Sequence, residues 1–220
     1  MVATLDNLAD GRVVLGLGAG WQQNEHEAYG IEYGTAGSRL DMLEESCQVL
    51  KGLFHNDHFD FDGKYYQLRN APLEPKPKQA KIPLMIGGGG EKRTLKITAQ
   101  YADEWNVWGD VAILKHKMAI LDQHCEAVGR DPNEIERSAV ALLFLSDNEN
   151  YLKRIRSADM NMPAIIGTVN EVIDIIANFE EAGVKELIVP DFTLGTLIGA
   201  DSVKLEIMEK FITEVAGASK

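Results

Sequence analysis

The protein is a chain of 220 residues with a formal net charge of −12 and a sequence pI of about 4.9. So acidic a chain lacks the basic face that binds nucleic acid or an anionic membrane surface. No apolar run approaches the ~20 residues of a membrane span, and the N-terminus has no signal-peptide pattern. We therefore expect a cytoplasmic protein whose two cysteines, Cys47 and Cys125, are free thiols of a reducing compartment.

The first half of the chain predicts a strand, a helix and a hairpin. Arg12–Gly18 is a short apolar run that closes in glycines, which indicates a buried strand. Apolar residues recur at helical spacing over 38–54, where Ser38 is the expected cap. Phe59–Leu68 alternates around Asp62-Gly63 and predicts a β-hairpin, which a proline-rich connector follows.

The second half predicts strands that alternate with helices. Asp110 is expected to cap a helix that Gly129 ends, and Thr168 and Glu171 have the spacing of a capping box for a helix that reaches Gly183. The other expected elements are strands at 84–86, 104–108, 138–145 and 186–190, and helices at 93–101 and 202–215.

This alternation indicates βα units around a parallel sheet, which is an α/β fold. We expect a single domain over 1–220 with five units, which begin at Val13, Leu84, Glu104, Ser138 and Glu186.

Two glycine clusters follow predicted strands, at Gly16–Gly20 and at Gly87–Gly90. Ligands of parallel α/β proteins bind beyond the carboxyl ends of the strands. The second cluster leads into a helix whose first turn holds Lys92, Arg93 and Thr94, and free N–H groups beside a cation form an anion site. The cluster is thus either a phosphate cradle or a flexible turn that binds nothing, and the pattern leaves both open.

Other phosphate motifs fit less well. Glu91 separates Gly90 from Lys92, which breaks the P-loop pattern. The first cluster resembles half of a dinucleotide fingerprint, but Trp21-Gln-Gln replaces the third glycine and no helix is expected there. A nicotinamide-dependent dehydrogenase is therefore a weak alternative.

We predict no metal ligands. His55-Asn-Asp-His58 lies near several aspartates, but a calcium loop that began at His58 would have Arg69 at its twelfth position, where a carboxylate is needed. Trp105 and Trp108, which flank Asn106, are more simply core residues than walls of a pocket.

Six stretches follow one another along nearly the whole chain: LDNLADGRVVLGLGAGWQQNEHEAYGI, RLDMLEESCQVLKGLF, FDGKYYQL, APLEPKPKQ, IPLMIGGGGEKRTLKITAQYADEWN and GTVNEVIDIIANFEEAGVKELIV. In this order and spacing they resemble the luciferase-like monooxygenase family, most closely its branch that uses coenzyme F420. The resemblance implies a (β/α)8 TIM-type barrel with FMN or F420 at its C-terminal face.

The resemblance also implies the roles of particular residues. The loop after the first strand would lie against the flavin or deazaflavin, and the second glycine cluster would hold its phosphate. These cofactor residues are Gly18, Ala19, Gly20, Asn24, Gly87, Gly88, Gly89, Gly90 and Arg93, while Trp21 and Asn106 are expected in the substrate pocket.

The chain also departs from the family pattern. The family has about three further strands before the segment that begins here, so we expect an incomplete barrel that lacks the N-terminal portion. Trp21 stands where the sugar-phosphate dehydrogenase branch has an acidic residue, and none of the five histidines occupies a family catalytic position. We therefore predict no catalytic residue.

Three functions follow from these observations. The first is an F420- or FMN-dependent oxidoreductase with weak or no activity by itself, acting on a small molecule. The second is a non-catalytic protein that keeps the fold for cofactor binding or assembly, and the third is the dehydrogenase mentioned above. The strands at Val13 and Glu186 should be open edges of the sheet, which predicts a homodimer or another homo-oligomer.

Overall fold

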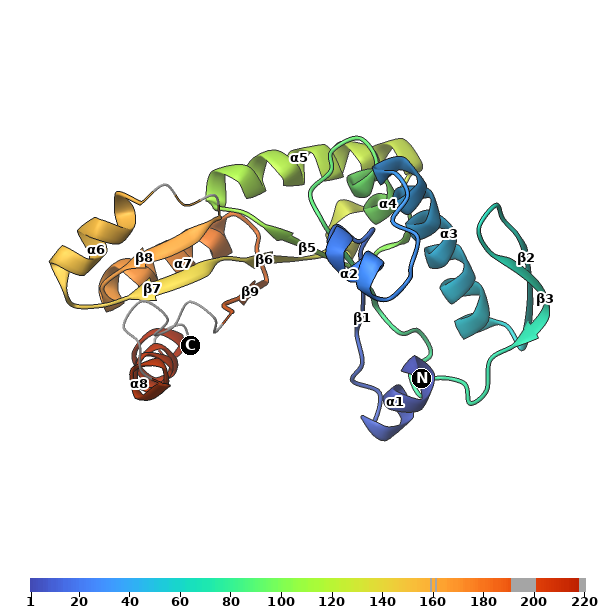
Figure 1. Ribbon diagram of the computed structural model, residues 1–220, viewed down its shortest axis with the longest axis horizontal. Coiled ribbons are helices and arrows are strands. Elements are labelled where there is room, and N and C mark those ends of the chain that lie inside the picture. The colour runs from blue at the N-terminus through green and yellow to red at the C-terminus, as the bar shows by residue number, and fades with distance from the viewer. Residues whose placement is uncertain (159, 161, 191–200, 218–220) are drawn as a thin grey trace. The chain divides into compact units, whose positions relative to one another are not determined.

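The structure is a computed structural model that describes residues 1–158, 160, 162–190 and 201–217 (Figure 1). The chain divides into two compact units, one of residues 1–105 and 120–135 and the other of residues 106–119 and 136–220. No helix among the described residues is long and apolar enough to cross a membrane. The single domain over 1–220 and the cytoplasmic location stay predictions.

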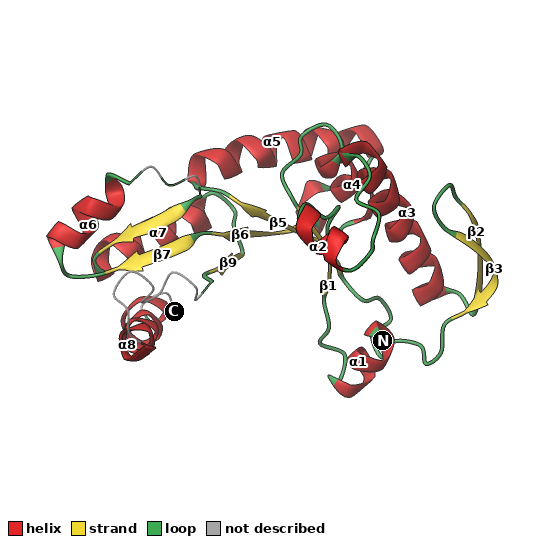
Figure 2. Ribbon diagram, viewed as in Figure 1, coloured by secondary structure: helices red, strands yellow, loops and turns green. Residues whose placement is uncertain are grey.

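The first unit contains helices and strands in alternation, with one hairpin (Figure 2). Its elements are α1 (Val2–Leu8), β1 (Leu15–Leu17), α2 (Gln23–Ala28), α3 (Ala36–His55), β2 (His58–Asp62), β3 (Gln67–Pro72), β4 (Leu84–Gly87), α4 (Thr94–Tyr101) and a 3-10 turn (Pro132–Glu134). Two further elements, β5 (Glu104–Trp108) and α5 (Val111–Val128), have residues in both units.

The second unit also alternates strands with helices. Its elements are β6 (Glu136–Val140), β7 (Leu142–Leu145), α6 (Glu149–Arg156), β8 (Ala164–Gly167), α7 (Val169–Glu181), β9 (Glu186–Ile188), α8 (Asp201–Lys210) and a π-helical turn (Phe211–Ala216).

The principal sheet is parallel, which confirms the α/β class and the five expected strands. The strand order is β1-β4-β5 in the first unit and β5-β6-β9 in the second. Leu15 pairs with Leu84 and Leu17 with Ile86, while β6 and β9 pair over Ser138–Val140. Among the described residues β1 pairs only with β4 and β9 only with β6, so these residues close no barrel.

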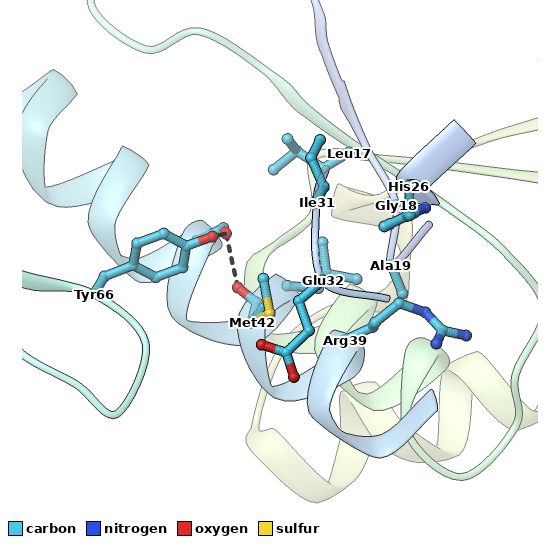
Figure 3. A pocket seen from close by; sticks show the side chains of 11 residues that line it. Leu17, Gly18, Ala19, His26, Ile31, Glu32, Arg39, Met42 and Tyr66 are labelled. Carbon is cyan, nitrogen blue, oxygen red and sulfur yellow. Dashed lines mark hydrogen bonds between the residues drawn. The ribbon is translucent and has the colours of Figure 1, made fainter. Parts of the chain in front are cut away.

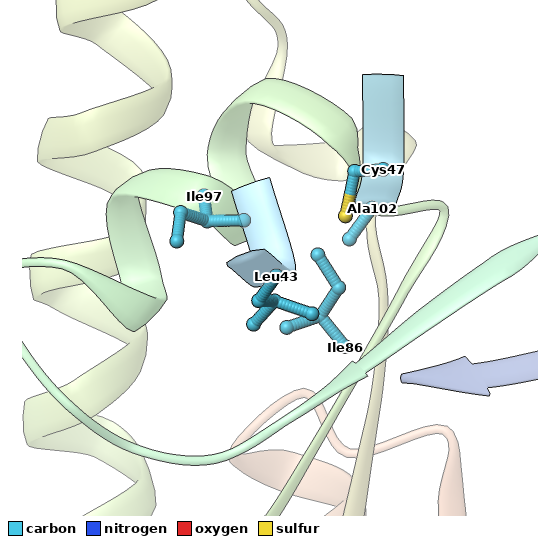
Figure 4. Packing of buried hydrophobic residues seen from close by; sticks show 5 residues of the cluster. All are labelled: Leu43, Cys47, Ile86, Ile97 and Ala102. Atoms are coloured by element: carbon cyan, nitrogen blue, oxygen red, sulfur yellow. The ribbon is translucent and has the colours of Figure 1, made fainter. Parts of the chain in front are cut away.

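The apolar core of the first unit joins α3, β4 and α4. Leu43 and Cys47 lie one turn apart on the inner face of α3 and pack with Ile86, Ile97 and Ala102 (Figure 4). Residues i and i+4 of a helix share a face, and alternate residues of a strand do so too, so these spacings direct one stripe of each element inward. The core fixes β4, and with it the glycines that follow.

Several sequence expectations on local structure are confirmed. Residues 58–72 form the antiparallel hairpin of β2 and β3, and Asp110 Oδ1 accepts from the Ile113 N–H at 2.8 Å at the start of α5. The capping box at Thr168 and Glu171 is present, and Gly129 and Gly183 have positive φ angles just after their helices.

Other expectations are wrong in detail. The cap of α3 is Thr35, whose side chain accepts from the Ser38 N–H, so Ser38 is the third helical residue of a capping box. A short helix, α2, opens after Trp21 where none was expected. The apolar run 138–145 is two strands, because the backbone changes partner at Ala141: β6 pairs with β9, and β7 pairs in parallel with the unpredicted strand β8.

Candidate functional site

The two glycine clusters lie side by side in the first unit. Each follows one of two adjacent parallel strands, since Leu17 of β1 is in register with Ile86 of β4. A Cβ atom on Gly18 would lie 3.8 Å from the Gly87 carbonyl oxygen, and one on Gly87 would lie 3.7 Å from the Leu17 oxygen. The sequence predicted each loop separately, and the parallel pairing brings them to one edge of the sheet.

The second cluster, Gly87–Gly90, forms a turn without side chains between β4 and α4. Gly88 has a φ angle of +127°, and its carbonyl oxygen accepts from the indole N–H of the buried Trp105 at 2.9 Å. Trp105 is therefore a core residue whose indole N–H also holds the glycine turn at Gly88 in place. A Cβ on Gly90 would lie 2.7 Å from Thr94 Oγ1, so a side chain there would crowd the start of the helix.

The first turn of α4 has backbone N–H groups without a hydrogen-bond partner among the described residues. No side chain caps this helix, and the Leu95 N–H is taken by the Gly90 carbonyl at 3.0 Å. Within the part of the chain that the structure describes, the N–H groups of Thr94 and Lys96 and the Thr94 hydroxyl donate to no other residue. Uncapped N–H groups at the positive end of a helix attract anions. The residues present therefore fit a phosphate group.

The Arg93 side chain is bonded to residues of α3. Its guanidinium lies 2.7 Å from Asp41 Oδ1 and 3.5 Å from Glu44 Oε2, and it donates to the Gly37 carbonyl at 3.3 Å. The two carboxylates neutralise much of its charge. Its geometry favours a role in joining α3 to α4 at the edge of the glycine turn.

The loop after β1 contacts residues of the segment that follows it, namely His26 and Tyr33. Gly20 has a φ angle of +72°, and a Cβ there would lie 3.1 Å from the His26 ring. Trp21 is 80% exposed, and its carbonyl accepts from the Tyr33 hydroxyl at 3.0 Å. Asn24 lies on α2 with an exposed side chain. Gly18, Gly20 and Trp21 therefore lie in the loop after β1, and Asn24 lies on the short helix that follows it, while their cofactor and substrate roles stay predictions.

A pocket of about 140 Å³ lies between this loop, α3 and the hairpin (Figure 3). It is lined by Leu17, Gly18, Ala19, His26, Ile31, Glu32, Arg39, Met42, Leu43, Ser46 and Tyr66. At one wall the Ser46 hydroxyl donates to the Tyr66 hydroxyl at 3.2 Å, as the dashed line in Figure 3 marks. The sequence had indicated only Gly18 and Ala19 of this set.

Glu45 fixes the hairpin turn that supplies Tyr66. Its carboxylate accepts from the backbone N–H groups of Lys64, Tyr65 and Tyr66 at 2.8, 2.9 and 3.1 Å. Burial raises the pKa of this carboxyl, but the three N–H donors outweigh that effect and the pKa is lowered overall. Glu45 is therefore ionised at neutral pH and acts as a cap for the hairpin.

Asn106 belongs to the second unit. It lies on β5, and its side-chain amide donates to the Ser138 hydroxyl of β6 at 2.7 Å. Its expected place in a substrate pocket stays a prediction. No group of three or more His, Cys, Asp or Glu side chains within the described ranges could hold a metal ion.

The sequence did not identify Thr94 or Arg39 as site residues. The sequence placed Thr94 in the first turn of the helix without giving it a role. In the structure α4 begins at Thr94, and the Thr94 hydroxyl lies beside Gly90. Arg39 is one of several charged residues of a long helix, and no local pattern distinguishes it. Its contacts depend on how the loop returns to α3.

A parallel sheet with glycine turns at adjacent carboxyl ends is an arrangement in which α/β proteins bind ligands. The family model of the luciferase-like monooxygenases matches residues 1–155. The chain therefore belongs to the luciferase-like monooxygenase family.

The aligned share of the chain differs between the relatives found by sequence. An uncharacterised protein of Mycobacterium tuberculosis H37Rv is 31% identical over 130 residues, which is 59% of this chain and 45% of the relative. A pyrimidine monooxygenase, RutA of Caulobacter segnis, is 27% identical over 227 residues, which is 98% of this chain and 62% of RutA. The chain thus spans about half to two thirds of the length of these relatives.

Solved structures share the fold at low identity. A long-chain alkane monooxygenase, LadA, matches with a TM-score of 0.77 at 15% identity over 98% of this chain and 64% of LadA. The F420-dependent tetrahydromethanopterin reductase of Methanopyrus kandleri matches with 0.74 at 17% identity over 100% of this chain and 78% of the reductase. An F420-dependent secondary alcohol dehydrogenase matches with 0.73 at 23% identity over 86% of this chain and 66% of that enzyme.

Proposed function

We propose that the chain binds F420 or FMN and takes part in an oxidoreductase or monooxygenase reaction on a small molecule. The observation that carries the proposal is the contact between the two glycine turns, with Gly18 and Gly87 each facing the backbone of the neighbouring strand. Family membership and the F420 dependence of two structural relatives support it. A bound flavin or deazaflavin would supply hydride transfer, which no amino-acid side chain provides.

The residues of this chain would hold the cofactor in two places. The N–H groups of Thr94 and Lys96, with the Thr94 hydroxyl, would bind its phosphate behind Gly87–Gly90. The turn Gly18–Gly20 would lie against its ring system, and the absence of a side chain on Gly18 keeps the space beside Gly87 open.

Titration of the purified chain with FMN, F420 and NAD, followed by fluorescence, tests this proposal. We expect FMN or F420 to bind and NAD not to bind. Gly18→Val should weaken binding by about tenfold or more, which corresponds to ~1.4 kcal/mol or more, because it inserts a side chain between the turns. Gly16→Val is the matched control, since Gly16 lies on β1 two residues before Gly18, and a Cβ there meets no atom within 4 Å.

Equal binding by Gly18→Val and the parent would contradict the assignment of the turn. A parent that binds neither FMN nor F420 would contradict the proposed function and favour the alternative of an assembly protein that keeps only the fold.

We also propose that the chain turns over little substrate by itself. Two observations support this. The matches span only 45% and 62% of the relatives' length. Trp21, an indole that cannot exchange a proton with substrate, stands where the sugar-phosphate dehydrogenase branch of the family has an acidic residue. General acid–base help contributes about 10²–10⁴-fold to rate, so turnover without it should be slow. Fast F420H2- or FMNH2-dependent turnover by the purified 220-residue chain would contradict this proposal.

A further inference from the structure

Arg39 connects α3 to both ends of the loop that follows β1. Its Nε donates to the Gly20 carbonyl at 3.0 Å, and its Nη1 donates to the Tyr33 carbonyl at 3.1 Å. A longer contact from Nη1 to the Gly34 carbonyl measures 3.5 Å. One planar guanidinium therefore joins residues 20 and 33, which are the start and the end of the segment that carries Trp21 and α2.

The ring of Tyr33 completes this connection. The guanidinium carbon of Arg39 lies 3.9 Å from the centre of the Tyr33 ring, a stacking distance that favours a cation–π contact. The other edge of Tyr33 contacts the loop, since its hydroxyl donates to the Trp21 carbonyl and its ring meets His26 edge-on at 5.1 Å. The contacts thus run from α3 through Arg39 and Tyr33 to Gly20, Trp21 and His26.

The His26 ring is itself held in one orientation. Its Nδ1 lies 2.8 Å from the Gln22 carbonyl oxygen, so Nδ1 carries the hydrogen of this bond. The same ring occupies the space beside Gly20, where a Cβ would lie 3.1 Å from it. The left-handed turn at Gly20 is therefore enclosed by His26 and bonded to Arg39.

These bonds fix the direction of two peptide groups. In a trans peptide the C=O and the next N–H point in opposite directions. Because the Gly20 and Trp21 carbonyls are bonded to Arg39 and Tyr33, the N–H groups of Trp21 and Gln22 point away from those partners. Neither N–H donates to another residue that the structure describes.

We propose that Arg39 is a positioning residue that holds the loop 18–34 in the shape that receives the cofactor. Its part in cofactor binding rests on the proposed function, whereas its hold on the loop rests on the contacts above. Lysine cannot replace it, because a single ammonium group on a flexible stem cannot bond two separated carbonyls in a fixed plane and stack on Tyr33.

Amide hydrogen exchange of the chain without cofactor tests the hold on the loop. The N–H groups of His26, Tyr29, Gly30 and Ile31 are bonded within the loop and should report its opening. In Arg39→Lys we expect these amides to exchange about tenfold faster, while those of the β2–β3 hairpin do not change. Arg12→Lys is the matched control, since Arg12 is exposed and its side chain donates, among the described residues, only to the Ala9 carbonyl at the end of α1.

Titration with FMN and F420 then tests the link to the cofactor. We expect Arg39→Lys to bind about tenfold more weakly than the parent and Arg12→Lys to bind equally. Tyr33→Phe, which keeps the stacked ring and loses the bond to Trp21, should give a smaller effect of the same sign.

Unchanged exchange in Arg39→Lys would overturn the inference. Faster exchange with unchanged binding, in a parent that binds, would also overturn it. Faster exchange in a parent that binds neither cofactor would leave Arg39 as the anchor of the loop and would instead refute the proposed function.

Discussion

Gly88 has the most unusual backbone among the residues of the second glycine turn. Its φ angle of +127° lies in a region that side-chain-bearing residues rarely adopt, and a Cβ there would lie 3.3 Å from Thr94 Cγ2. We expect Gly88→Ala to lower the free energy of unfolding by about 1–3 kcal/mol. Urea unfolding would measure the loss.

Gly16→Ala serves as the control for this prediction. Gly16 has no positive φ angle and has open space around its Cβ position, so its replacement should change stability little. Equal stability of Gly88→Ala and the parent would mean that the turn adopts another backbone conformation in solution. Since Gly88→Ala acts on folding, Gly18→Val remains the better test of cofactor binding.

Cys47 is a buried thiol with low reactivity. It is fully enclosed in the core of the first unit, where burial raises the pKa of the thiol to about 12. Because the thiolate is the reactive form, we expect a thiol reagent at neutral pH to leave Cys47 unmodified in the folded chain. Cys125 is equally buried, so both thiols should react only after unfolding in urea. Rapid labelling of folded protein would show that these helices open.

At the scale of elements, Asp6 ties α1 to the connector that precedes β4. Its carboxylate accepts from the Gln79 backbone N–H at 2.8 Å and from the Gln79 side-chain amide at 2.7 Å, with a longer contact of 3.4 Å to the Val13 N–H. Burial raises the pKa of Asp6, but these donors outweigh it and lower the pKa below the ordinary 3.8.

The lowered pKa of Asp6 gives a pH dependence of definite sign. The folded state prefers the ionised carboxylate, so this stabilisation is complete above 3.8 and is lost as the pH falls through the lower folded-state pKa. We expect Asp6→Asn to be less stable than the parent near neutral pH, and the difference should shrink as the solution becomes acidic.

Thermal unfolding from neutral to acid pH measures this difference in stability. Asp10→Asn is the control, because the Asp10 carboxylate forms an exposed ion pair with Lys78 and contacts no other charged side chain in the part of the chain that the structure describes. A constant difference between Asp6→Asn and the parent over the whole pH range would show that the loss comes from packing and not from ionisation.

At the scale of the molecule, β1 pairs only with β4 and β9 only with β6 within the described residues, so these two strands are candidates for pairing with another chain. Beside them Val14 is 42% exposed, and Ile188 of β9 is 37% exposed. Apolar edges with unpaired N–H and C=O groups favour association between chains. We expect a homodimer or another homo-oligomer, which sedimentation at micromolar concentration would detect.

A charge at the edge should weaken this association. We expect Val14→Lys to shift the chain towards monomer, whereas Val128→Lys, at the end of α5 and 40% exposed, should not. A stable monomeric parent at micromolar concentration would refute the prediction.

Much of the fold could be predicted from the sequence because its signals are local. Apolar runs that end in glycine predicted β1 and β4, and the capping pair of Thr168 and Glu171 predicted the start of α7. Residues 138–145 were predicted as one strand because the apolar run is continuous, and nothing local indicates that β6 and β7 pair with different strands. The short strand β8 follows Pro163 and has too few residues to show a period.

The sequence by itself determined the candidate turns, since a glycine run after an apolar segment is a property of neighbouring residues. Only the tertiary structure decided that Gly18 and Gly87 meet, that Arg93 pairs with Asp41 and Glu44, and that Arg39 holds Gly20 and Tyr33. Local propensity depends on adjacent residues, whereas these contacts join segments that are distant in the chain. They form because β1 and β4 pair in parallel and because α3 packs on β4 through Leu43, Cys47 and Ile86, which brings its polar face to both glycine turns.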